Sequence, residues 1–184
     1  MKILLCSLLL LGLTATAQTK LEFTPTLVTE DFKSGESRHL LDRSMIIEYH
    51  TGGTERLEFD LVNKNGGPTT AFWAVKNEDT YFYDYMDLNN NSGETITYRS
   101  LKFYSRHPAT MYAVAINVPK NFDRPGWIGY VFWNEENGVK EWTRTIYVYL
   151  TPEDAKKAFY FAARAVKKLN LKKTNSQSLY IDVD

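Results

Sequence analysis

Aromatic side chains are the residues of this chain with the clearest capacity to bind a ligand, and they make up 14% of the sequence. The densest run contains Tyr81, Tyr83 and Tyr85, which share one face of a strand because strand side chains alternate. Such a row can stack on sugar rings or hold a peptide, since each tyrosine combines a flat apolar ring with a hydroxyl group. Trp127 and Trp133 are evenly spaced on a later segment and predict a second aromatic surface. The alternative is that all five rings fill a core between two sheets.

Carboxylates could support a different chemistry, the hydrolysis of a glycosidic bond. Glu135, Glu136 and Glu141 are close in sequence to two tryptophans, but the first two fall in a predicted hairpin turn, where solvation explains them. A hydrolase would need two of Glu135, Glu141, Asp84 and Asp87 within about 5–10 Å of each other. The sequence has no G-x-S-x-G elbow and no glycine-rich phosphate loop. We therefore predict no catalytic residue and keep a hydrolase with loop carboxylates as an alternative.

A metal site is only weakly indicated. Asp87, Asn89 and Asn91 match positions 1, 3 and 5 of a calcium loop, but Gly93 comes one residue late and Tyr98 occupies the place of the required glutamate. The histidines are not spaced as metal ligands: His39, His50 and His107. We predict no metal and no cofactor, with calcium at Asp87, Asn89 and Asn91 in another geometry as an alternative.

Strands must position these residues, because alternating segments dominate the chain from Thr19 to about Leu150. Leu57, Phe59 and Leu61 alternate with charged residues, as in a strand with one face in water. Tyrosine, phenylalanine, threonine and valine recur between turn clusters, and these residue types suit a pleated, half-buried surface.

Turn residues divide these strands. Gly52-Gly53 supplies the positive φ of a tight hairpin, and Arg124-Pro125-Gly126 predicts a type II turn. Met111–Val118 is more uniformly apolar, which predicts a central strand covered on both faces. Because no helix separates the strands, we expect an antiparallel β-sandwich or open barrel of about seven to ten strands with one C-terminal α-helix.

The pattern changes to a helix over about 152–169. Thr151 is the expected N-cap, and Asn170 can adopt the left-handed conformation that ends a helix. Leu171–Gln177 is a predicted polar linker, followed by a short strand or tail over 178–184. We expect this lysine-rich helix to cover part of the sheet; contact with an anionic membrane or a partner is the alternative.

The first residues predict an export signal. Lys2 precedes the apolar stretch Ile3–Leu13, and Ala15-Thr16-Ala17 matches a small-x-small cleavage site. About 20 apolar residues are needed to span a bilayer, and no segment of the chain reaches that length. We expect a signal peptide over 1–17 and a single β-rich domain over 18–184. The single cysteine, Cys6, falls within the leader.

The whole pattern predicts a protein exported to the periplasm or the extracellular space. Its 22 basic and 22 acidic residues cancel, which argues against nucleic-acid binding. We expect a non-catalytic binding module for a glycan, a peptide or an envelope protein, with Tyr81, Tyr83, Tyr85, Trp127 and Trp133 as ligand-binding residues. A structural cell-envelope subunit, held by the helix or a sheet edge, is a second alternative to the binding module, beside the hydrolase.

Overall fold

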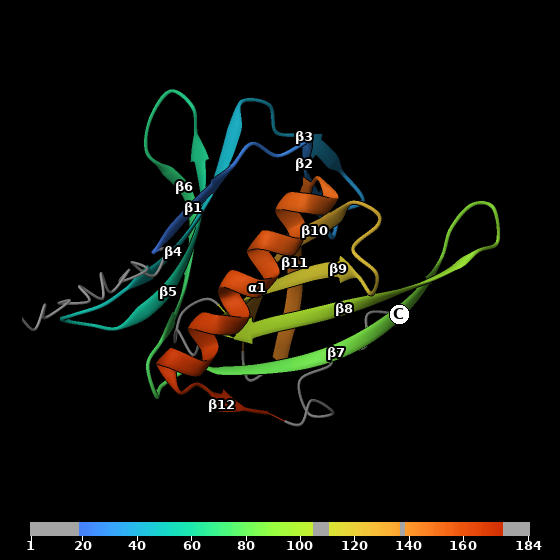
Figure 1. The fold of residues 1–184 in the computed structure, drawn as a ribbon. Helices are drawn as coiled ribbons and strands as arrows, with labels where there is room; N and C mark the ends of the chain where they lie inside the picture. The colour runs from blue at the N-terminus through green and yellow to red at the C-terminus, as the bar shows by residue number, and fades with distance from the viewer. Residues whose placement is uncertain (1–18, 105–110, 137–138, 175–184) are drawn as a thin grey trace, which may run out of the picture.

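The computed structural model describes residues 19–104, 111–136 and 139–174, and in these ranges the chain forms two β-sheets and one α-helix (Figure 1). The small sheet has the strand order β1-β4-β5-β6. Its strands are β1 (Lys20–Phe23), β4 (Arg43–His50), β5 (Arg56–Asn63) and β6 (Pro68–Val75). The predicted hairpin glycines Gly52 and Gly53 join β4 to β5, and both have positive φ.

The large sheet has the order β12-β7-β8-β9-β10-β11-β2-β3. Its strands are β2 (Leu27–Phe32), β3 (Ser37–His39), β7 (Thr80–Asn89), β8 (Thr95–Tyr104), β9 (Met111–Pro119), β10 (Gly126–Glu136), β11 (Val139–Leu150) and β12 (Lys172–Lys173). All its pairings are antiparallel except that of β12 with β7. The predicted central strand, now β9, lies between β8 and β10.

The two sheets pack together through phenylalanine rings. Phe59 of β5 lies 6.0 Å from Phe72 of β6 and 5.4 Å from Phe103 of β8, measured between ring centroids. The predicted alternation on β5 is confirmed, since Leu57, Phe59 and Leu61 are all buried. The protein is therefore a mainly β, two-sheet sandwich with one helix, as the sequence predicts.

Helix α1 (Pro152–Leu169) lies between the two sheets along the side where they separate (Figure 1). It contacts β9, β10 and β11 of the large sheet and β4 and β5 of the small one. The Thr151 hydroxyl accepts a hydrogen bond from the backbone N–H of Asp154 at 3.2 Å, and Asn170 has φ of 51°. Thr151 is therefore the N-cap and Asn170 ends the helix in the left-handed conformation, as the sequence predicts.

Two local predictions are wrong. Gly126 does not have the positive φ of a type II turn; it begins β10, where a Cβ atom would lie 2.6 Å from the Asn117 carbonyl oxygen and 2.8 Å from the Ala155 Cβ. Lys172–Lys173 is not part of a linker but pairs in parallel with Thr80–Tyr81 of β7. The predicted leader over 1–17 and the predicted strand or tail over 178–184 lie outside the described residues.

Candidate binding face on the large sheet

The two faces of the large sheet separate its side chains by strand alternation. Ile128, Ile146 and Val148 are buried against the small sheet and the helix, so the residues that alternate with them face outward. We call this outward surface the aromatic face. It carries Phe82, Tyr98, Tyr104, Trp127, Trp133, Trp142, Tyr147 and Tyr149.

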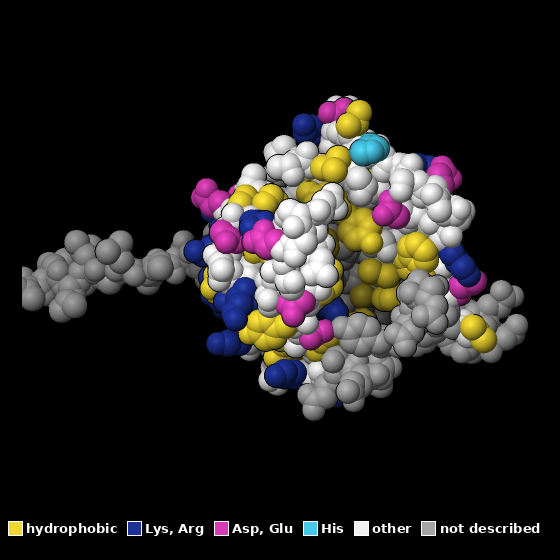
Figure 2. All heavy atoms as spheres, turned by 90° about the vertical axis from the view of Figure 1, so that its right-hand side faces the viewer, with side chains coloured by type: hydrophobic (Ala, Val, Ile, Leu, Met, Phe, Trp, Pro, Cys, Tyr) yellow, Lys and Arg dark blue, Asp and Glu magenta, His cyan; other side chains and the backbone are white. Residues whose placement is uncertain are grey.

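Small residues form the floor of the aromatic face at its centre. Gly129 of β10 pairs with Ala115 of β9, and the neighbouring pair is Val131 with Ala113. Gly129 is buried, yet a Cβ atom built on it would meet no described atom within 4 Å, so the described residues leave room for a side chain above this glycine. The side from which the β7–β8 hairpin projects shows hydrophobic side chains gathered in a hollow of the surface (Figure 2).

One wall of this floor comes from β10 and β11. Trp127 lies opposite Tyr149 and Gly129 lies opposite Tyr147 in the strand register, while Trp133 lies opposite Trp142. The Tyr147 and Tyr149 rings are 6.4 Å apart. These five aromatic side chains are all partly exposed, so their ring surfaces are accessible to a ligand.

The opposite wall comes from β7 and β8. The Phe82 and Tyr104 rings stack at 5.5 Å with an interplanar angle of 9°. Lys102 Nζ lies 4.8 Å above the Phe82 ring centroid and 3.6 Å from Asp84 Oδ2. Burial lowers the pKa of the Lys102 ammonium group, although Asp84 opposes this effect. This wall therefore combines two stacked rings with an ion pair in which Lys102 and Asp84 offset each other's charge.

Polar groups lie among these rings. The Ser100 hydroxyl donates a buried hydrogen bond to Asn117 Oδ1 at 2.7 Å, and the Trp142 indole N–H donates to the Thr145 hydroxyl at 2.8 Å. Burial, followed by the charge of Asp31, raises the pKa of both Tyr147 and Tyr149. Both tyrosines therefore keep a hydroxyl proton available for donation at neutral pH.

The predicted tyrosine row points the other way. Tyr81 and Tyr83 pack against the core, and the Tyr83 ring meets Phe159 of the helix at 6.1 Å. Burial and a hydrogen bond with Tyr85 raise the pKa of Tyr83 to about 12. Only Tyr85 is largely exposed, at 57%. The five predicted binding residues are thus divided, with Trp127 and Trp133 on the aromatic face and the three tyrosines on the inner face.

Two of the predicted carboxylates, Asp84 and Glu141, lie far apart. Asp84 on β7 and Glu141 on β11 are separated by four strand spacings, about 19 Å, which exceeds the 5–10 Å expected for a glycosidase pair. Glu141 forms an ion pair with Lys33, and Asp87 is exposed near the end of β7. The Glu135 and Glu136 side chains lie outside the described ones.

The polar turn after β7 is organised by its own hydrogen bonds. Asn90 Oδ1 accepts from the backbone N–H groups of Ser92 and Glu94, and Asn89 Oδ1 accepts from the Thr95 hydroxyl. Asp87, Asn89 and Asn91 are all exposed. Within the described ranges, no group of three or more acidic, histidine or cysteine side chains is arranged to hold a metal ion.

Sequence reasoning missed an acid–base cluster on the outer face of the small sheet. His50 Nε2 lies 3.1 Å from Glu58 Oε2 and 3.5 Å from Glu48 Oε2. Burial, together with the nearby Glu58 and Glu48, raises the pKa of Asp60 to about 6. His50 is the last residue of β4, and only strand pairing brings it beside β5.

Sequence reasoning also missed six residues of the aromatic face. For Tyr147 and Tyr149 a signal was available, because they alternate with Ile146, Val148 and Leu150, which the core buries. For Trp142 no such signal was available, because the register shift between Phe132 and Trp133 determines which face of the sheet the Trp142 side chain lies on.

No protein-family model, curated protein or solved structure matches this chain. In the part of the chain that the structure describes, no helix combines the length and the apolar character needed to cross a membrane.

Proposed function

We propose that this protein is an exported, non-catalytic binding module that takes a glycan on the aromatic face of its large sheet. The observation that carries the proposal is the room that the described residues leave above the buried Gly129, flanked by the partly exposed rings of Trp127, Tyr147 and Tyr149. A small floor between aromatic walls has the form needed to admit a flat ring.

The chemistry of the face favours a sugar over a peptide. Aromatic rings stack on the apolar faces of sugars, while tyrosine hydroxyls and the Asp31 carboxylate can bond hydroxyl groups at the rim. An extended peptide needs an unpaired strand edge for its backbone hydrogen bonds. Strands β8 to β11 are paired on both sides, so the centre of this face offers side chains only.

The charged groups of the face favour binding over catalysis. Asp84 lies beside Lys102, which neutralises its charge, and Asp31, another described carboxylate on this face, accepts a hydrogen bond from Ser37. A hydrolytic pair would need two carboxylates placed on either side of one bond.

A glycan array with the mature chain tests the proposal, together with Gly129→Leu and Tyr85→Ala variants. Gly129→Leu fills this room without entering the core, so we expect about tenfold or greater loss of binding with the fold retained. Tyr85→Ala removes an exposed ring elsewhere and should leave binding unchanged. Absence of any glycan binding by the parent, or full binding by a folded Gly129→Leu variant, would overturn the proposal. Peptide binding at the same face would replace the sugar assignment.

A further inference from the structure

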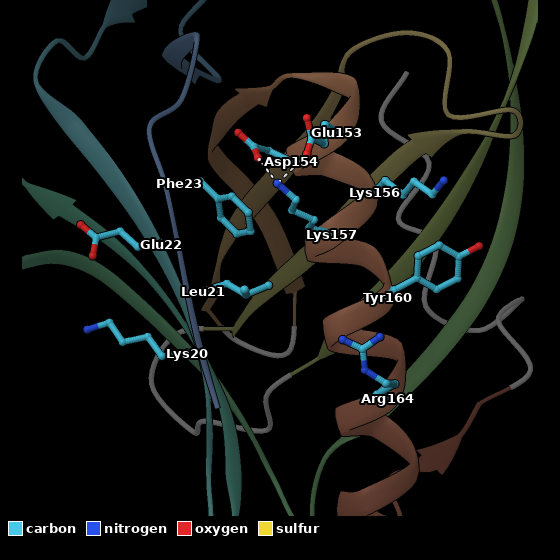
Figure 3. Close-up of a pocket in the computed structure, with 10 residues that line it drawn as sticks. All are labelled: Lys20, Leu21, Glu22, Phe23, Glu153, Asp154, Lys156, Lys157, Tyr160 and Arg164. Carbon is cyan, nitrogen blue, oxygen red and sulfur yellow. Dashed lines mark ion pairs between the residues drawn. The ribbon is translucent and has the colours of Figure 1, made fainter. Parts of the chain in front are cut away.

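A groove lies between β1 and helix α1, on the side of the molecule away from the centre of the aromatic face. It has a volume of about 650 Å³. Leu21 and Phe23 point from β1 toward the helix, and Lys157 and Arg164 point from the helix toward β1 (Figure 3). The groove thus has an apolar wall on a strand and a charged wall on a helix.

The strand wall is an unpaired sheet edge. Among the described strands, β1 pairs only with β4. The backbone N–H of Tyr49 donates to the Thr19 carbonyl at 2.7 Å, so these two residues form a hydrogen-bonded pair of the ladder. Because hydrogen-bonded pairs alternate along an antiparallel ladder, Leu21 and Phe23 also bond to β4 through their backbones. The backbone groups of Lys20 and Glu22 therefore point away from β4, where an added strand can bond them.

The two ends of the groove differ in charge, and Lys20 itself forms an ion pair with Glu48 of β4. At the Phe23 end, Glu153 and Asp154 form ion pairs with Lys157. At the Lys20 end, Arg164 is exposed (Figure 3). An added strand with a negatively charged C-terminal end therefore fits best when it runs antiparallel to β1 and ends near Lys20 and Arg164.

The last six residues of this chain have that character. Leu179, Ile181 and Val183 alternate with Tyr180, Asp182 and Asp184, the pattern of a strand with one apolar face. Placed antiparallel with Leu179 opposite Phe23, the segment sets Ile181 opposite Leu21 and Asp182 beside Lys20. Its apolar side chains then enter the groove, and the acidic Asp182 and Asp184 lie at the Arg164 end.

The reach of the chain assigns this segment to a second copy. The described chain ends at Thr174, whose backbone N–H donates to the Tyr81 carbonyl on β7, across the helix from β1 (Figure 1). Thr174 follows the C-terminal end of α1, whereas Phe23 lies beside Glu153 and Asp154 at its N-terminal end (Figure 3). The five Cα–Cα steps from residue 174 to residue 179 span at most about 18 Å, which is less than the length of about 27 Å of this 18-residue helix. A chain cannot readily place this segment in its own groove.

We propose that residues 179–184 of one copy add as a strand to the β1 edge of a second copy, in the groove beside α1. The contact joins two different surfaces, so it leads to chains of subunits or to reciprocally exchanged dimers. It goes beyond the proposed glycan binding and leaves the aromatic face free.

Complementation between two variants of the full mature chain tests this. Glu22→Pro removes an outward N–H while keeping the β4 pairing, because proline is tolerated at a sheet edge. Ile181→Asp places a charge on the apolar face of the tail. Glu22→Gln and Ser176→Asp are the matched controls, which keep the N–H group and the tail pattern.

The parent and both controls should show concentration-dependent association by light scattering, and each test variant alone should be monomeric. An equimolar mixture of Glu22→Pro and Ile181→Asp should form a one-to-one complex, since one brings an intact tail and the other an intact groove. Arg164→Glu should weaken parental association by about tenfold, whereas Lys167→Glu on the same helix should not.

A parent that stays monomeric, or a mixture that does not associate, would overturn the proposal. A monomeric parent whose thermal midpoint falls with Ile181→Asp would instead place the tail on its own chain. Circular dichroism of each variant confirms that its fold is retained.

Discussion

The two faces of the large sheet both carry aromatic rings, yet the rings serve different purposes. On the inner face, Tyr83 packs edge-on against Phe159 of the helix, so its ring fills space between elements. On the outer face, Trp127, Trp133 and Tyr147 are partly exposed around a floor of small residues. The difference shows that aromatic composition alone does not identify a binding surface; what matters is whether another element covers the ring.

Two glycines on β10 give the strongest test of this contrast. A Cβ atom on Gly126 would clash with the Asn117 carbonyl and Ala155, so Gly126→Ala should lower the free energy of unfolding by up to about 3 kcal/mol. Gly129→Ala should leave it unchanged or raise it by about 0.5 kcal/mol, because its Cβ would meet no described atom within 4 Å. Urea denaturation of both variants measures the difference. Equal effects would contradict an open outer face.

Ring deletion on the two faces gives a second test. Tyr83→Ala removes a ring that packs on the helix and core and should destabilise the protein by about 2 kcal/mol. Trp133→Ala removes a partly exposed ring and should cost less than about 1 kcal/mol while weakening ligand binding. Thermal denaturation followed by binding measurements separates the two roles. A larger loss of stability from Trp133→Ala would indicate that this ring is structural.

The outer face of the small sheet adds a smaller, pH-dependent test, because it is polar where the aromatic face is apolar. The folded-state pKa of Asp60, at about 6, lies above its ordinary value of 3.8, so the fold disfavours the ionised form. The penalty is present above pH 6 and disappears as the pH falls toward 4. Because Asp60 is half-buried, solvent screening reduces it to about 1 kcal/mol.

Asp60→Asn should therefore stabilise the protein by that amount at pH 8 and have almost no effect at pH 4. Urea denaturation across this range measures it, with Asp123→Asn as the exposed control. A constant offset at all pH values would show that hydrogen bonding, rather than ionisation, causes the change.

Local sequence signals predict the elements of this fold well. The helix over Pro152–Leu169, its Thr151 and Asn170 caps and the alternation on β5 all agree with the structure. Each depends on residues within one turn or one strand. The β12 pairing and the role of Gly126 could not be predicted, because both depend on contacts with residues distant in sequence.

The same distinction applies to the candidate site. The spacing of Trp127 and Trp133 predicts that they share a face, but no spacing states which face remains uncovered. Tyr81, Tyr83 and Tyr85 have an equally regular pattern but lie on the inner face, where Tyr81 and Tyr83 pack against the core. The other rings of the aromatic face, beside Trp127 and Trp133, come from separate strands, and the order of strands in the sheet brings them together.

The sequence by itself determines which residues alternate, where the helix begins and ends, and that aromatic rings will line the strands. Only the tertiary structure decides that α1 and the small sheet cover one side of the large sheet rather than the other. The physical reason is that both faces of an aromatic strand can be buried favourably, and packing against distant elements selects one of them.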